Sequence, residues 1–270
     1  METRAILASP LGFLIGLSLG ALGGGGSILA VPALVYGAGQ SPRDATTTSL
    51  LLVGIAALVG MASHWRAGRV QVRTGLTFGL IGIGGSVAGS ALNREIDPNV
   101  LLLMFSGLVC VAAWRMITGC PTCTRVGEQA ALDQTASSGH AAIDWQLAVT
   151  VIAAGTAVGF LTGLFGVGGG FVIVPALALV LKLPMPQAIG TSLLVIAVNS
   201  AVALTSRVAT SSIDWGVTLP FVVAAIAGVL TGGRVADRLD PQRSLRWFAA
   251  LLVGVAIYTA TRATIDLLAG

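Results

Sequence analysis

Two kinds of residue in this chain have the types and spacing to hold a small anion: clustered glycines and Thr–Ser pairs. Gly23 to Gly26 form one glycine cluster and Gly166 to Gly170 form another, and Thr48–Ser49 and Thr191–Ser192 each open a later apolar stretch. Glycines let a backbone approach a ligand, and hydroxyl groups and the N–H groups at a helix start donate hydrogen bonds to an anion. We therefore predict an anion site, to which Asn199 adds an amide one to two turns further along.

The predicted substrate-binding residues contain no Lys or Arg, so binding would rest on dipoles and neutral donors, weakly enough to allow release. Simpler roles remain open: glycines can serve close helix packing, hydroxyls can cap a helix, and Asn199 can bond between helices. His64 and His140 are assigned to solvated loops. The predicted set is Gly24, Gly25, Gly26, Ser27, Thr48, Ser49, Gly168, Gly169, Gly170, Thr191, Ser192 and Asn199.

These residues occupy matching places because the chain is duplicated. A shift of 143 positions aligns the second half with the first without a gap, and fifteen of the 44 pairs between residues 16 and 59 are identical. About one pair in ten would match by chance in a chain so rich in Ala, Gly, Leu and Val. Internal repeats of this kind are typical of transporter folds.

The composition indicates a membrane protein, since 55% of residues are apolar and only 10% are charged, whereas a soluble domain has about a quarter charged residues. Every Asp and Glu lies outside the apolar runs or at their ends, as the cost of a charge in a bilayer requires. A spanning helix needs about 20 apolar residues. The predicted spans are 5–22, 46–64, 74–92 and 99–117, then 147–165, 188–206, 215–233 and 244–262.

Each half also has a shorter apolar piece, 27–38 or 170–182, which follows the glycine cluster and contains a proline. A dozen helical residues reach only about 18 Å, so we expect a broken or re-entrant hairpin that turns at the glycines. The fold class predicted is an all-α integral membrane protein of two inverted tandem repeats, each with about four spanning helices plus one short broken or re-entrant helix. The repeats are 1–118 and 144–270, joined by a polar cytoplasmic linker, 119–143.

Inversion of the halves is expected for two reasons. Basic residues crowd the loop before segment 74–92 in the first half and the loop after segment 215–233 in the second. Both clusters can be cytoplasmic only if the halves are inverted. Five segments per half, counting each hairpin as two, also invert the second copy.

Other function classes are disfavoured by what the sequence lacks. The net charge of +4 comes from residues in short loops, so no nucleic-acid partner is expected. No cofactor or metal is predicted, and no cluster of catalytic residues lies at membrane depth, so the protein is not expected to be an enzyme. The alternative is a membrane sulfur-relay or thiol-redox protein that uses Cys120 and Cys123.

The glycine motif resembles that of the sulfite exporter TauE/SafE family. The pattern G-x-G-G-G-x-x-x-x-P reads from Gly166 to Pro175 in the second half and from Gly23 to Pro32 in the first, where Ser27 replaces the last glycine. The resemblance covers nearly the whole chain and implies a multi-pass transporter of the bacterial inner membrane, with a small sulfur-containing anion such as sulfite, thiosulfate or an organosulfonate as its cargo. From the residues we predict alternating access at a midplane site formed by both hairpins, with an anion channel as the alternative.

Overall fold

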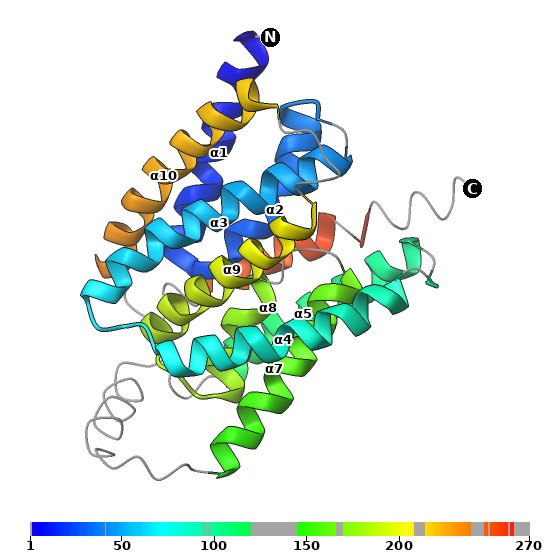
Figure 1. Cartoon of the computed structure of the whole chain (residues 1–270), viewed down its shortest axis with the longest axis vertical. Helices are drawn as coiled ribbons and strands as arrows, with labels where there is room; N and C mark the ends of the chain where they lie inside the picture. The colour runs from blue at the N-terminus through cyan, green and yellow to red at the C-terminus, as the bar shows by residue number, and fades with distance from the viewer. Residues whose placement is uncertain are drawn as a thin grey trace.

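Apart from turns and short loops, the part of the chain that the computed structural model describes is helical (Figure 1), which confirms the all-α class. That part is residues 2–40, 42–93, 95–96, 98–119, 145–165, 170–207, 214–238, 246–247, 249–258 and 260–261. The long helices are α1 (Glu2–Leu22), α3 (Pro42–Arg66), α4 (Val72–Asn93), α5 (Pro98–Gly119), α7 (Trp145–Phe165), α9 (Met185–Arg207) and α10 (Trp215–Arg238), and a further apolar helix covers Ala249–Tyr258.

The outer faces of the helices are apolar, as a bilayer requires. Among the described residues, α3, α4, α9 and α10 are long and apolar enough to cross a membrane by length and composition. Leu80 and Val87 on α4 are 61% and 68% exposed, and Leu219 on α10 is 60% exposed. Exposing so many large apolar side chains to water is unfavourable unless another protein covers them. In a membrane, lipid tails cover them. The chain is therefore a multi-pass membrane protein.

The short apolar piece after α1 folds back as a broken hairpin, as predicted. A 3₁₀ turn, η1 (Gly23–Gly26), leads into helix α2 (Ser27–Pro32) and a π-helical turn, η2 (Ala33–Gly37). Gly26 lies against Ile15 and Leu19 of α1, and Gly37 lies against Leu11. The chain thus retraces part of α1 in the opposite direction.

The second half repeats this local structure at equivalent positions, with helix α8 (Gly170–Pro175) followed by a π-helical turn, η4 (Ala176–Val180). The Ala38 N–H group donates to the Ala33 carbonyl at 3.2 Å, and the equivalent Leu181 N–H donates to Ala176 at 3.2 Å. Each wide turn follows a proline, which lacks the N–H of a regular helical bond. The duplication seen in the sequence is thus a duplication of structure.

The two halves interlock. Helix α1 packs along α10, and its equivalent α7 packs along α4 (Figure 1). A Cβ on Gly16 of α1 would overlap the carbonyl of Ala225, and a Cβ on the equivalent Gly159 would overlap the carbonyl of Gly82. Such close backbone contact is how membrane helices associate without a hydrophobic driving force. Each half therefore supplies one helix to each of two equivalent pairs.

Helices α3 and α9 lie between these pairs and contact each other. Gly54 of α3 faces Ser200 of α9, whereas Gly60 faces Leu193. Residue numbers rise along one helix as they fall along the other, so these two equivalent helices run antiparallel. Inverted halves require this arrangement, although the orientation of the halves in a bilayer stays a prediction.

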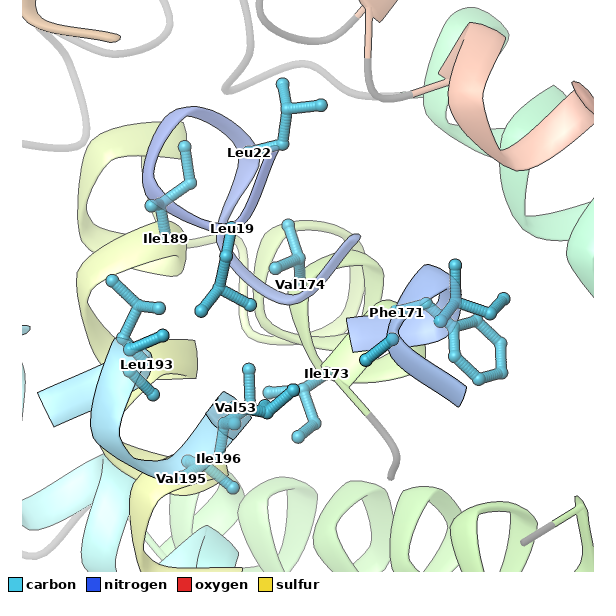
Figure 2. Close-up of a cluster of buried hydrophobic side chains, with 14 of the residues drawn as sticks. Leu19, Leu22, Val53, Phe171, Ile173, Val174, Ile189, Leu193, Val195 and Ile196 are labelled. Atoms are coloured by element: carbon cyan, nitrogen blue, oxygen red, sulfur yellow. The ribbon is translucent and has the colours of Figure 1, made fainter. Parts of the chain in front are cut away.

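The buried core fills the space where α1, α3, α8 and α9 meet. Figure 2 shows Leu19, Val53, Ile173 and Ile196 pointing into one cluster from these four helices, and each is at most 5% exposed. The core therefore consists of residues from both halves.

Candidate functional site

The turn of the first glycine hairpin meets the start of α8 in the second half. A Cβ on Gly24 would overlap the carbonyl of Gly170, and a Cβ on Gly170 would lie 2.5 Å from the Ser27 hydroxyl oxygen. Ser27 is buried, and its hydroxyl donates to the Gly24 carbonyl at 2.7 Å. Ser27 and Gly170 are equivalent positions, so the serine fills the space left by the glycine it faces. Gly25 is in the turn, and Gly168 and Gly169 lie outside the described residues.

The first hairpin also contacts helix α9. Gly23 turns the chain with φ of +71°, and a Cβ there would lie 2.8 Å from the Ser192 hydroxyl oxygen. Ser192 donates its hydroxyl hydrogen to the Ile189 carbonyl at 2.7 Å, and the equivalent Ser49 donates to Thr46 at 2.8 Å. Both serine hydrogens are therefore used within a helix in this state. Only the oxygen lone pairs remain, unless the side chains rotate.

The Thr–Ser pairs do not open their helices, which is a correction to the sequence analysis. Helix α3 begins at Pro42 and α9 at Met185, so Thr48 and Thr191 lie in the second turn. The N–H groups of a second-turn residue bond to carbonyls of the preceding turn. These residues therefore offer a ligand their hydroxyl groups alone.

The two threonines differ in their hydrogen bonds, although both are fully buried. The Thr191 hydroxyl oxygen accepts a hydrogen bond from the Gln71 N–H group at 3.1 Å. The Thr48 hydroxyl has no hydrogen-bond partner. An unpaired buried hydroxyl lowers the stability of the fold. The Thr48 hydroxyl is therefore available to bind a polar group.

Asn199 extends the polar face that Ser192 begins. The two residues are seven apart, so they lie on one face of α9 about 10 Å apart along its axis. The Asn199 side-chain oxygen is buried without a hydrogen-bond partner and lies near Gly79 of α4. The α3–α9 register places Asn199 near the middle of both helices. A polar group at mid-depth between two repeats is where transporter sites occur.

The predicted residues fall into separate groups. Because Gly60 faces Leu193, Thr191 lies level with the end of α3 near Ala62, roughly 14 residues from Thr48, or about 20 Å at 1.5 Å per residue. A small anion cannot contact both Thr–Ser pairs at once. The structure instead places the two pairs level with opposite ends of α3, with Ser192 against Gly23 of the first hairpin.

Sequence reasoning missed Gln71, Gln187 and His64. Gln71 and Gln187 join the loop before α4 to helix α9 by a side-chain hydrogen bond of 2.9 Å. Nothing in the apolar pattern marks them. His64 was expected in a loop, but it lies within α3 and is only 4% exposed, because the helix continues to Arg66.

The buried part of the site carries no formal charge. No Asp, Glu, Lys or Arg is buried among the described residues. Within the same residues, no group of three or more His, Cys, Asp or Glu is placed to hold a metal ion. Cys120 and Cys123 lie outside the described part of the chain. The arrangement can therefore bind a polar or anionic solute through neutral groups.

Comparison with known proteins gives one consistent result. The model of the family described as "Sulfite exporter TauE/SafE" matches residues 8–259. A "probable membrane transporter protein" of Xylella fastidiosa is 34% identical over 262 residues, covering 96% of this chain and 95% of the relative. The Bacillus subtilis "probable membrane transporter protein YunE" is 26% identical over 245 residues, covering 87% and 85%. No solved structure matches the chain.

Proposed function

We propose, because the chain belongs to the sulfite exporter TauE/SafE family of membrane transporters, that it carries small sulfur-containing anions across the membrane. Sulfite, thiosulfate and small organosulfonates are the cargo class. Transport proceeds by alternating access, in which the centre of the molecule faces one side of the membrane and then the other.

The observation that supports the proposal is the backbone contact between the first glycine hairpin and the start of α8, beside a neutral polar face. Gly24 and Gly170 are in backbone contact, and Gly23 contacts Ser192 at the start of the face that leads to Asn199. Irregular backbone is tolerated at membrane depth where it is buried in protein or lines a cavity. The Asn199 amide NH2 group, and the Ser192 hydroxyl once it rotates away from the Ile189 carbonyl, would supply neutral donors that hold an anion less tightly than a buried Arg or Lys.

Export is the favoured direction. An anion leaves a cell that is negative inside with a gain of about 2.3 kcal/mol per charge per 100 mV. Uptake would need a coupling ion, and no buried carboxylate is available within the described residues to carry a proton. Outward movement of an anion needs no such group.

The test is flux in liposomes that contain the purified protein. We expect saturable flux of at least one sulfur anion, with chloride excluded, and a fall of about tenfold in Asn199→Leu, which removes a polar group worth about 1.4 kcal/mol. Ser106→Ala is the matched control, since that serine is buried but donates only within α5, to Leu103. Flux that rises without saturation would identify a channel. Absence of flux for every sulfur anion, from folded protein, would reject the proposed cargo.

A further inference from the structure

The loop between α3 and α4 is tied to the start of α9 through Gln71. Its N–H group donates to the Thr191 hydroxyl at 3.1 Å, and its side-chain amide donates to the Gln187 side-chain oxygen at 2.9 Å. Thr74 donates to the Gln71 side-chain oxygen at 3.1 Å and holds the amide in place. One residue thus joins the two halves through both its backbone and its side chain.

The residue types around Gln71 allow the loop to lie directly on α9. A Cβ on Gly190 would be 2.8 Å from the Arg69 carbonyl oxygen and 3.1 Å from the His64 Cβ. Gly68 has φ of +68°, which lets the chain turn sharply between the helices. The loop therefore covers this end of α9 without space for a side chain at position 190.

The residue types at the equivalent positions of the other end differ. The shift of 143 residues replaces Gln71 by Asp214, Gln187 by Asp44 and Gly190 by Thr47. The two helices following the loops begin alike, since Gly75 N–H donates to the Gln71 carbonyl at 2.8 Å and Thr218 N–H to the Asp214 carbonyl at 2.9 Å.

The two ends differ in the hydrogen bonds made by the equivalent threonines, Thr191 on α9 and Thr48 on α3. Thr191 accepts a hydrogen bond from Gln71, whereas Thr48 has no partner. Aspartate has no side-chain amide N–H group, so Asp44 and Asp214 cannot form the amide–amide bond that joins the two glutamines. Among the described residues, the glutamine contact thus occurs at one end.

We propose that Gln71, Gln187 and Thr191 form a gate that closes one end of the substrate path and must open in each transport cycle. This inference rests on the proposed transport function. Thr191 precedes Ser192, where the polar face towards Asn199 begins. The gate therefore lies at the end of that face farthest from Asn199. Its bonds are neutral and individually weak, so they can break and re-form during a cycle.

The first test measures access to the polar face and needs no substrate. In protein whose cysteines are replaced by serine, Ser192→Cys provides a thiol that is fully buried in this state. We expect Gln187→Leu to speed its reaction with a membrane-impermeant thiol reagent, added on the side of the 67–71 loop, by about tenfold. Thr77→Val is the matched control, since its hydroxyl donates only within α4. The equivalent probe Ser49→Cys should not react faster from that side.

The second test locks the gate. A reducible cross-linker between Gln71→Cys and Gln187→Cys should stop flux, and reduction should restore it. The control pair Arg73→Cys and Thr77→Cys lies on one helix and should tolerate the same treatment. Unchanged Ser192→Cys labelling in Gln187→Leu, or full flux after cross-linking, overturns the gate. Gated labelling without flux of any sulfur anion rejects the cargo and keeps the gate.

Discussion

At the scale of single residues, Thr48 and Thr191 show how one residue type at equivalent positions takes on different roles. Both are fully buried, but only Thr191 is hydrogen-bonded to another helix, by the Gln71 N–H group. An unpaired buried hydroxyl lowers stability by roughly 1–3 kcal/mol. Thr48 therefore gives up stability in this state, and a ligand that bonds to its hydroxyl would regain it.

Thr48→Val should test whether the Thr48 hydroxyl serves ligand binding rather than stability. Valine keeps the shape but removes the unpaired hydroxyl, so we expect unchanged or higher thermal stability in detergent together with lower flux. Thr191→Val should instead lower stability by about 1 kcal/mol, because the Gln71 N–H group loses its acceptor. Equal losses of stability in the two variants would show that Thr48 is bonded within the protein, which contradicts its assigned role.

At the scale of elements, glycine seams decide which helices pair. Gly85 of α4 lies on the seam with α7, where a Cβ would overlap the Thr156 carbonyl, whereas a Cβ on neighbouring Gly84 would meet nothing within 4 Å. Glycine in a membrane helix is typical of close helix packing, so residue type alone does not distinguish the two positions. Which one faces the partner depends on the rotation of the helix, and that is set by tertiary contact.

Gly85→Ala and Gly84→Ala form a matched pair of adjacent substitutions. The first should destabilise the protein by about 1–3 kcal/mol, because the added methyl group forces α4 and α7 apart. The second should be neutral or stabilising by up to about 1 kcal/mol, since alanine favours a helix over glycine. Unfolding in detergent with a denaturant measures both. A loss of stability confined to Gly84→Ala would contradict the seam.

The sequence predicts elements better than their ends and partners. The helices and the hairpin turn at Gly23–Gly26 follow from apolar length and glycine placement, which are local properties. The apolar runs predict helix starts at 46 and 188, about a turn after the observed starts of α3 and α9, because polar residues such as Arg43 and Gln187 precede those runs. The separation of Thr48 from Thr191 follows from an antiparallel register between distant segments, and no local pattern encodes that register.

At the scale of the whole molecule, the packing of helices from one half against helices from the other limits which movements transport can use. Helices α1 and α10 form one pair, α7 and α4 form the other, and each pair contains a helix from each half. Helices α1 and α10, and likewise α4 and α7, are in close backbone contact, whereas the α3–α9 contact between the pairs uses side chains such as Ser200 and Leu193. Movement between the pairs, rather than between the halves, therefore fits the packing.

The orientation of the halves can be measured directly. If they are inverted, the loop before α4 and the equivalent loop before α10 lie on opposite sides of the membrane, and the antiparallel course of α3 and α9 requires this when both helices span it. In protein without native cysteines, Gly68→Cys and Trp215→Cys should react with an impermeant thiol reagent from opposite sides of sealed vesicles. The basic residues around Gly68 predict that this loop is cytoplasmic. Labelling of both positions from the same side would contradict inversion, and alternating access through two opposed ends would then have no structural basis.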